Sequence, residues 1–384
     1  MAPSPVYWDH AATSWPKPPQ VQAAIQDWFE RLGVDASRGS TALHQEVASK
    51  TADLRRRLGR LCKVPSERVL LGSGATFAAN LFLKGILNAG DRVFATRFEH
   101  NAVARPLLGM QHSGMIHLDV VPADPFLGPT PSDLDRCLKG GKAPRLLCLN
   151  HASNVTGLVL DVAPLIAWAK ERSCLVLLDC AQSIGRLPLQ DLSADAFLIP
   201  GHKALMGPPG VGALCLSRDC PIPRPLVEGG TGSATPDGLM PKSLPAGLEA
   251  GTANTPGRMG WLAALKALEG KEESQLKKEL LSLQQIWDAL EPLETQGRLK
   301  RIGPPPSFPR RVAVLSLDLM GRDPVEVAML LESQGFILRA GQHCAPWIHE
   351  DLGTHPLGTL RISPGGEIQK KDLLRFCNVL ETYL

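Results

Sequence analysis

A lysine in the middle of the chain has a setting that suits covalent chemistry on a carbonyl compound. Lys203 stands in the segment PGHKALMGPPG (200–210), directly after an apolar run that is typical of a buried strand. An amine at the dry end of a strand is expected to have a lowered pKa, and the neutral amine attacks carbonyl groups. The simpler interpretation is a surface lysine on a turn, and the neighbours of Lys203 decide between the two.

Two segments nearer the N-terminus supply such neighbours. Asp179 stands in the apolar run CLVLLDCAQ (174–182), where a carboxylate is costly to bury without a partner. It either caps the next helix or pairs with a cationic ring nitrogen, and Gln182 then reaches the same ligand. The turn GSGAT (72–76) leads into a helix whose free N–H groups suit a phosphate, although the turn alone matches neither a P-loop nor a dinucleotide-binding motif. A lysine for an aldehyde, an acid for a ring nitrogen and a helix start for a phosphate are the parts of a pyridoxal phosphate site.

A cysteine far downstream is a candidate nucleophile. Cys344 lies in RAGQHCAP (339–346), a loop bounded by glycine and proline, where Arg339 and His343 are placed to stabilise a thiolate. A lone cysteine is more often a small buried apolar residue. A further alternative is a metal site formed by His343, Cys344, His349 and His355. Their spacing matches no standard zinc pattern, so we expect no metal.

An arginine near the C-terminus is a candidate for binding a carboxylate. Arg361 stands within the strand-like run GTLRIS. An arginine in a strand is usually paired with a carboxylate, either of the protein or of an amino-acid substrate. The sequence leaves both interpretations open.

Strands and helices alternate through the first half of the chain, which predicts an α/β fold with a mostly parallel sheet. The expected strands are residues 68–74, 91–96, 145–151, 174–182, 194–200 and 211–217. A helix is expected over 75–90, closed by Gly90. Ligands of such sheets bind beyond the carboxyl ends of the strands, and GSGAT, RFEHNA, DCAQ and PGHK all fall at such ends.

The second half of the chain differs from the first in composition and in its pattern of expected elements. Residues 220–257 are rich in Gly and Pro and form a segment too long for a simple connection. The rest predicts a smaller α+β unit, with a helical stretch near 258–293, strands near 310–319 and 336–339, and helices near 323–334 and 367–383.

Composition and charge argue against several classes of protein. The chain has 384 residues, of which 44% are hydrophobic and 21% charged, and this length suits two domains. A net charge of +3 with scattered basic residues argues against nucleic-acid binding, and the run Arg55–Arg57 fits a solvated helix face. No apolar run approaches the roughly 20 residues of a membrane span, so we expect no membrane association.

The cysteines and the N-terminal segment bear on the compartment. Nine cysteines without a CxxC pair indicate a reducing environment rather than a disulfide framework. The N-terminal segment lacks the basic start and apolar core of a secretory signal. We therefore expect a cytoplasmic protein.

The ordered set of motifs resembles the class V aminotransferase-like pyridoxal phosphate enzymes, and within them the cysteine desulfurases and selenocysteine lyases. WDHAATSWPKPP is similar to the family's N-terminal element LDNAATT, and EHNA, NHASNVTG, LLDCAQ, GHK, EAGTANT and RAGQHCAP follow in the family's order. The short cysteine segment resembles that of group II desulfurases. The resemblance implies fold type I of the pyridoxal phosphate transferases, with a large domain of residues 15–257 and a small α+β domain of residues 1–14 with 258–384.

The resemblance also implies the residues that hold the cofactor. Lys203 joins the aldehyde of pyridoxal 5'-phosphate covalently, Asp179 pairs with the ring nitrogen and Gln182 contacts the ring oxygen. His100 stacks on the ring and assists proton transfer. The phosphate contacts implied by the family are Ala75 and Thr76 at the helix start, His202 beside them, and Thr252 reaching across a homodimer with shared active sites.

The implied substrate is L-cysteine. Asn154 and Arg361 hold its carboxylate with Arg339 close by, and Cys344 accepts its sulfur. The products are L-alanine and a persulfide on Cys344, which a sulfur-acceptor protein can take up. A selenocysteine lyase or another C–S lyase of the same family is the nearest alternative. A class V transaminase and a non-catalytic binding protein are the others.

Four positions depart from the family pattern. Pro200 stands where the family has a phosphate-bonding serine, so one phosphate contact is missing or replaced. His10, Ser37 and Gln342 stand where the family has an asparagine and two histidines. These three lie on the substrate side and bear on the identity of the substrate.

Overall fold

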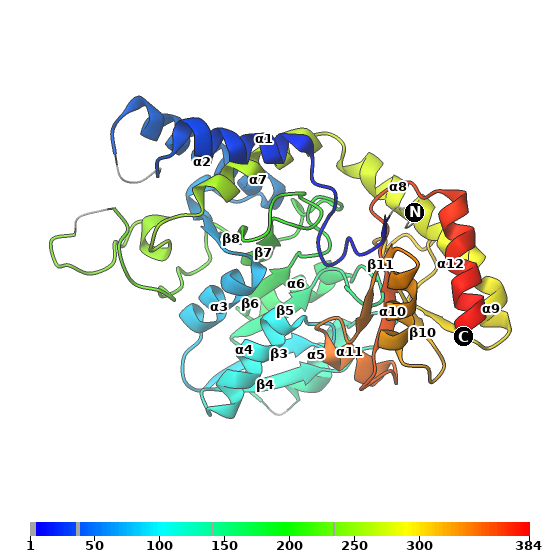
Figure 1. Ribbon diagram of the computed structural model, residues 1–384. Coiled ribbons are helices and arrows are strands. Elements are labelled where there is room, and N and C mark those ends of the chain that lie inside the picture. The colour runs from blue at the N-terminus through cyan, green and yellow to red at the C-terminus, as the bar shows by residue number, and fades with distance from the viewer. Residues whose placement is uncertain (1–4, 36–38, 140, 233–234) are drawn as a thin grey trace.

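The computed structural model describes residues 5–35, 39–139, 141–232 and 235–384. Its largest element is a seven-stranded sheet (Figure 1) with the strand order β2-β8-β7-β6-β5-β3-β4. In chain order its strands are β2 (Val69–Gly72), β3 (Asp91–Thr96), β4 (Ile116–Val121), β5 (Leu146–Asn150), β6 (Leu175–Asp179), β7 (Ala196–Pro200) and β8 (Gly212–Leu216). Neighbouring strands are parallel except at β8, which is antiparallel to both β2 and β7. The expected α/β fold with a mostly parallel sheet is confirmed.

The reversal at β8 follows from the short segment that joins it to β7. A parallel neighbour needs a crossover of a dozen or more residues, whereas an antiparallel neighbour can follow a short loop. Residues 201–211 form that loop, and its base is closed by a hydrogen bond from Gly201 N to Val211 O (2.9 Å). Lys203 is therefore held on a short loop at the carboxyl end of β7.

Helices cover both faces of the large sheet. One face packs on α3 (Ala75–Ile86) and α4 (Asn101–His112). The other face packs on α2 (Ala42–Cys62), α5 (Pro131–Leu138), α6 (Val162–Glu171) and α7 (Thr255–Leu268). In β5, Leu146 and Cys148 enter the first core while Leu147 and Leu149 enter the second. Burial on both faces explains why these strands are nearly continuous apolar runs.

The N-terminal helix lies along the outside of this second layer. It is α1 (Pro19–Asp27), and a π-helical turn (Trp28–Leu32) continues it. Gly260 of α7 allows the close approach, because a Cβ there would lie 2.9 Å from Ile25. A 3-10 turn (Ser66–Arg68) leads into β2.

The C-terminal part of the chain forms a smaller antiparallel sheet with the order β12-β13-β10-β9 (Figure 1). Its strands are β9 (Lys300–Ile302), β10 (Leu315–Asp318), β12 (Arg339–Gly341) and β13 (Thr359–Ile362). Its helices are α8 (Glu272–Ala289), α9 (Glu291–Thr295), α10 (Pro324–Ser333), α11 (Pro346–Asp351) and α12 (Lys370–Tyr383). The N-terminal strand β1 (Val6–Tyr7) pairs with β11 (Phe336–Ile337), which brings Trp8 into a core with Phe336 and Phe376.

Three expectations need correction. The helix expected over 75–90 ends at Ile86, because Leu87 is already extended, so Gly90 does not close it. The helical stretch expected near 258–293 is two main helices, α7 and α8, because Gly270 adopts a φ of +75° and ends the first. The strand expected over 310–319 is reduced to β10, since Val312 N bonds instead to Gly157 O of the large unit (2.9 Å). In the loop-rich segment 220–257 a 3-10 turn, Ala246–Leu248, is present.

The division into residues 15–257 and residues 1–14 with 258–384 stays a prediction. Within the described residues, no helix has the length and apolar character needed to span a membrane.

Candidate active site

A cavity of about 330 Å³ opens at the carboxyl ends of β5, β6 and β7, where Asn150, Asp179 and Pro200 line it. Most of the predicted site residues lie around this one cavity. They are Ala75, Thr76, His100, Asn154, Asp179, Gln182, His202, Lys203, Arg339 and Arg361. These residues come from both the large and the small sheet, and several are separated by more than a hundred positions in the sequence.

Asp179 is the only acid among the described residues that line the cavity. Its side chain is 3% exposed, and the burial raises its pKa, against the opposing effects of the Ala181 N–H and the charge of Lys203. The carboxylate accepts the Ala181 N–H through Oδ1 (2.9 Å). Asp179 therefore caps the following turn, as one of its two interpretations required, and also faces the cavity.

Lys203 lies opposite that carboxylate. Burial lowers the pKa of its amine to about 8, although Asp179 opposes the shift, and the charge of Arg361 adds to it. Among the described residues, no hydrogen-bond acceptor lies within reach of this amine. A partly neutral amine with a free lone pair, facing a cavity, is suited to attack a carbonyl carbon.

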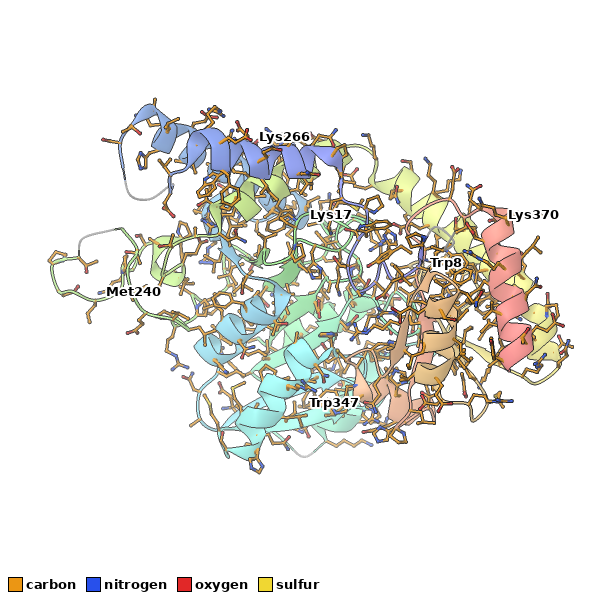
Figure 2. All side chains as sticks on the ribbon, viewed as in Figure 1. Trp8, Lys17, Met240, Lys266, Trp347 and Lys370 are labelled. Atoms are coloured by element: carbon orange, nitrogen blue, oxygen red, sulfur yellow. The ribbon has the colours of Figure 1, made fainter. Side chains whose placement is uncertain are left out.

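The main chain next to Lys203 is held tightly. The carbonyl oxygen of His202 accepts hydrogen bonds from Ser14 N (3.0 Å), Ser14 Oγ (3.1 Å), Thr13 Oγ1 (3.0 Å) and Lys17 Nζ (2.7 Å). Lys17 is labelled in Figure 2, on the N-terminal segment that leads into α1. Burial lowers the pKa of the His202 imidazole to about 4, so the ring is neutral beside the cavity.

The start of α3 forms another wall. Ala75 and Thr76 are its first residues, so their N–H groups have no partner within the helix. Gly74 precedes them with a φ of +150°, a conformation that favours glycine. Gly212 of β8 passes so close that a Cβ there would lie 2.5 Å from Gly74 Cα. The helix start is thus an uncovered group of donors at the edge of the cavity, which suits an anion.

His100 is the N-cap of α4, and its ring nitrogen Nδ1 accepts the N–H of Ala102 (3.0 Å). Burial, together with the charges of Lys203 and Arg339, lowers the pKa of the imidazole to about 3. Because Nδ1 accepts and the ring is neutral, Nε2 carries the proton. Gln182 is equally fixed, since Nε2 donates to the carbonyl of Ala11 (2.9 Å).

Arg361 is 1% exposed and uses part of its guanidinium within the protein. Nη2 donates to Asp9 Oδ1 (2.7 Å) and Nη1 to the carbonyl of Asn154 (3.2 Å). Nε has no partner among the described residues. The pairing of Arg361 with a protein carboxylate is confirmed by the contact with Asp9, whereas its binding of a substrate carboxylate stays a prediction for a residue that lines the cavity. Asn154 is held in turn by a hydrogen bond from Nδ2 to His343 O (2.7 Å).

Cys344 is not itself among the residues that line the cavity, although Arg339 and His343 are, and its Sγ accepts a hydrogen bond from Arg339 Nη2 (3.2 Å). His343 and Cys344 both have positive φ angles, +49° and +58°, so the loop turns sharply at the thiol. The carbonyl of Cys344 accepts the N–H of Asn101 (2.6 Å), the residue after His100. The thiol is partly exposed and is fixed both to β12 and to the start of α4.

His343, which precedes Cys344, and His349 are buried and neutral. Burial lowers the pKa of His343 far below its usual value and that of His349 to about 4. His343 pairs through Nε2 with Thr359 Oγ1 (2.9 Å), and His349 through Nδ1 with Thr354 Oγ1 (2.7 Å). Within the described part of the chain, no group of three or more His, Cys, Asp or Glu side chains could hold a metal ion.

Thr252 is not brought to the first cavity. It is exposed and lines a second cavity of about 430 Å³, which shares Ser73, Phe77 and Gly210 with the first. Gln342 also points elsewhere, since Nε2 donates to the carbonyl of Pro356 (2.8 Å).

The remaining departures from the family pattern have different positions. Pro200 lines the cavity at the end of β7. His10 is buried, and burial lowers its pKa to about 4. Ser37 lies outside the described residues.

Some residues of the site were missed from the sequence. Asp9 was quoted in WDHAAT and Glu99 in EHNA, but neither was assigned a role. Asn150 lines the cavity, and Glu99 is fully buried behind it, with Oε1 accepting the N–H of Asn150 (2.9 Å). A Glu next to a strand end was a visible signal; its burial became visible only in the fold.

The cavity fits pyridoxal phosphate in its donors and acceptors. Lys203 offers an amine without a hydrogen-bond acceptor, Asp179 offers a buried carboxylate, and the start of α3 offers uncovered N–H groups. These match the aldehyde, the ring nitrogen and the phosphate of that cofactor.

A lysine, an acid and a helix start at the carboxyl edge of a mostly parallel sheet are the arrangement of fold type I pyridoxal phosphate enzymes. The family model of the class-V aminotransferases matches residues 6–376, and the chain belongs to that family. Enzymes of this family use pyridoxal phosphate.

Curated relatives and solved structures agree with this assignment. The chain is 28% identical over 366 residues to a probable cysteine desulfurase of Methanothermobacter thermautotrophicus, covering 93% of this chain and 89% of the relative. It is 28% identical over 390 residues to the cysteine desulfurase CsdA of Escherichia coli, covering 99% and 94%. The apo structure of a cysteine desulfurase from Thermococcus onnurineus NA1 superposes with a TM-score of 0.88 at 26% identity, covering 98% of this chain and 94% of the other.

Proposed function

We propose that this protein is a pyridoxal-phosphate-dependent cysteine desulfurase, which converts L-cysteine to L-alanine and keeps the sulfur as a persulfide on Cys344. The observation that carries the proposal is the contact between Arg339 Nη2 and Cys344 Sγ (3.2 Å) beside a cavity that also holds Lys203. This hydrogen bond fixes the position of the Cys344 sulfur next to a residue that lines the cavity, where the sulfur of a bound substrate can be reached. The relatives named cysteine desulfurase support the same reaction.

The residues that would hold the cofactor are those whose donors and acceptors match it. Lys203 would bind the aldehyde, Asp179 the ring nitrogen, and Ala75 with Thr76 the phosphate. His100 would lie on the ring, with Gln182 at the ring oxygen and His202 beside the phosphate. When bound, pyridoxal phosphate supplies an electron-withdrawing ring that weakens the bonds to the substrate's α-carbon.

Proton movement falls to two groups of this chain. Lys203 has a pKa of about 8, so near neutral pH a fraction of its amine is free to take a proton from the α-carbon and return it. His100 carries its proton on Nε2, because Nδ1 is occupied by Ala102 N–H, and so offers a donor on its other side.

Three residues would bind the substrate carboxylate. Arg361 presents an Nε–H without a partner, and Asn154 and Arg339 line the same cavity. The contact with Asp9 fixes the plane of the Arg361 guanidinium, so little conformational freedom is lost when a carboxylate binds.

The sulfur transfer needs one acceptor thiol and no further oxidant or reductant. The Cys344 thiolate attacks the substrate sulfur, an S–S bond forms and the C–S bond breaks. The electron pair of the C–S bond stays with carbon, which takes up a proton on the way to alanine. The enzyme is left with a persulfide, and a sulfur-acceptor protein or a small thiol removes it.

We further propose that the protein works as a homodimer with shared sites. Thr252 is exposed beside a second cavity that continues from the first, and the segment around it exposes Val227 (51%) and Leu239 (67%). Met240 lies on the part of this segment that extends away from the large sheet (Figure 2). A second copy covering this segment would bury these apolar side chains and would place Thr252 near the phosphate site of its partner. Thr252→Ala should then weaken cofactor binding, and sedimentation should give twice the chain mass.

The cellular setting belongs to the same proposal. Nine free cysteines, of which six are buried, fit a reducing compartment, and we propose a cytoplasmic enzyme. The small and large domains predicted from the sequence would close around the cavity between the two sheets.

Replacing the acceptor thiol tests the proposal. Cys344→Ala should keep the visible absorbance of the bound cofactor and lose persulfide formation, because only the acceptor has been removed. Cys377→Ala is the matched control, since Cys377 is partly buried in the small unit, where it packs against the core containing Trp8. Full conversion of cysteine to alanine by Cys344→Ala would show that Cys344 is not the acceptor.

A further inference from the structure

Glu99 is a buried carboxyl that the proposed mechanism does not use. It is fully buried (0% exposed) between the end of β3 and the start of α4, next to His100. Its Oε1 accepts hydrogen bonds from Thr96 Oγ1 (2.7 Å) and Asn150 N (2.9 Å). Its Oε2 has no partner among the described residues. The side chain therefore ties the carboxyl ends of β3 and β5 together with one oxygen only.

Asp179 lies one strand further along the same edge. β5 lies between β3 and β6, and Asn150 is directly opposite Asp179 in the register of β5 and β6. Two carboxyl groups thus approach the same strand end from either side. Like charges in a buried site disfavour each other, so the carboxyl group with less support for its anion is the one expected to keep its proton.

The surroundings decide which of the two is protonated. Asp179 faces Lys203 and accepts a backbone N–H, both of which favour its anion. Glu99 meets Asp179 from β6 and the buried, neutral thiol of Cys148 from β5. His100, the next residue, is neutral, and no cation among the described residues lies close enough to stabilise a Glu99 anion. Burial raises the pKa of Glu99 to about 8, and the charge of Asp179 adds to this shift, while the hydrogen bonds from Thr96 and Asn150 oppose it.

We propose that Glu99 is a positioning residue that stays protonated, holds β3 and β5 together and leaves Asp179 as the single anion at this end of the sheet. An ionised Glu99 would raise the pKa of Asp179 and weaken its pairing with a cationic ring nitrogen. The statement about the ring nitrogen rests on the proposed function. The statement that Glu99 keeps its proton does not rest on the proposed function.

The first test measures the proton without using activity. Wild type, Glu99→Gln and the exposed control Glu291→Gln are unfolded with urea, as holoenzymes, between pH 5 and 9. As the pH rises above 4.5, the unfolded chain loses the proton of Glu99 while the folded chain keeps it, so unfolding is favoured. Glutamine has no proton to lose in this pH range, so Glu99→Gln lacks this contribution to the pH dependence of unfolding. The unfolding equilibrium constant of wild type relative to Glu99→Gln should therefore rise about tenfold per pH unit up to about pH 8 and then level off.

The outcomes of this test differ in how the ratio of unfolding equilibrium constants depends on pH. Glu291→Gln should keep a constant ratio to wild type at every pH. A constant ratio for Glu99→Gln as well, or one that falls with pH, would overturn the proposal, because Glu99 would then be ionised in the folded protein. If the second N–H of the amide prevents Glu99→Gln from folding at pH 7, Glu99→Met replaces it, because methionine does not titrate either, and a constant ratio would overturn the proposal in the same way.

The second test concerns the cofactor. The visible spectrum of the wild-type holoenzyme should change above about pH 8, where Glu99 ionises, and that change should be absent in Glu99→Gln. Parallel spectra of the two proteins across this range would contradict the positioning role. A protein that binds no cofactor at all would refute the proposed function and leave the unfolding result standing.

Discussion

Arg339 Nη2 lies 3.2 Å from Cys344 Sγ, and this contact joins the smaller sheet to the loop that carries the thiol. The same loop is fixed on its other side by the hydrogen bond from Asn101 N to Cys344 O (2.6 Å). The sulfur is therefore placed between β12 and the start of α4, beside the cavity that contains Lys203. Placement and a neighbouring cation are what an acceptor thiol requires.

Removing this contact should slow sulfur transfer to the thiol. Arg339→Ala removes a hydrogen bond from a charged donor, which is worth about 1.5–3 kcal/mol and holds the Cys344 sulfur in place. Persulfide formation on Cys344 in a single turnover should slow by roughly 10- to 100-fold, with Arg339→Lys in between. Arg56→Ala, on an exposed face of α2, serves as the control. An unchanged rate of persulfide formation in Arg339→Ala would mean that the contact does not position the sulfur.

The amine of Lys203 should govern how fast the apo-protein binds pyridoxal phosphate. With a pKa of about 8, its neutral fraction rises about tenfold between pH 7 and pH 9, and the rate of appearance of the visible band should rise with it. The charge of Asp179 raises this pKa, so Asp179→Asn should move the midpoint to lower pH. Lys203→Ala should give no covalent band, and Lys266→Ala should behave as wild type. A midpoint near pH 10 would indicate an exposed amine.

Restoring the serine at position 200 should tighten cofactor binding. Pro200 ends β7 and lines the cavity, where the family resemblance places a phosphate-bonding hydroxyl. One added hydrogen bond is worth about 0.5–1.5 kcal/mol, so the dissociation constant of pyridoxal phosphate should fall about 2- to 10-fold in Pro200→Ser. Equilibrium dialysis measures this dissociation constant. Weaker binding in Pro200→Ser would mean that the proline already gives the better fit.

A buried ion pair should decide how firmly the two sheets are joined. Arg186 Nε lies 2.7 Å from Glu279 Oε2, with the side chains 7% and 5% exposed; Arg186 follows β6, and Glu279 lies on α8. Glu279→Ala leaves a buried guanidinium unpaired and should lower the free energy of unfolding by about 3–5 kcal/mol. Glu171→Ala, which breaks the exposed pair with Arg172, should change it by less than about 1 kcal/mol. Equal changes in the free energy of urea unfolding for Glu279→Ala and Glu171→Ala would contradict the role given to the buried ion pair.

The parts of this fold that could be predicted from the sequence are those set by local pattern. Strands buried on both faces appear as apolar runs, and Asp179 and Lys203 stand out because they close or follow such runs. The break at Gly270 was missed, although a glycine followed by Lys-Glu-Glu is typical of one helix ending and another beginning. The reversed direction of β8 was not visible, because it depends on which strands pair.

The parts of the site that the sequence could not provide depend on long-range pairing. Asp9 reaches Arg361 because residues 9 and 363 form a parallel bridge, which no local pattern indicates. Glu99 follows β3 and Asp179 ends β6. The two residues come near each other only because β3 and β6 lie on either side of β5 in the sheet. The environment of a buried carboxyl is fixed by strand order, and strand order is settled by packing over the whole chain.

The most direct measurement of the central claim is the mass of the peptide that contains Cys344 after the holoenzyme has reacted with L-cysteine. The account predicts that this peptide gains the mass of one sulfur atom, about 32 Da, and that alanine forms in equal amount during the first turnover. Alanine formed while the Cys344 peptide keeps its original mass, or sulfur found on another cysteine, would contradict it.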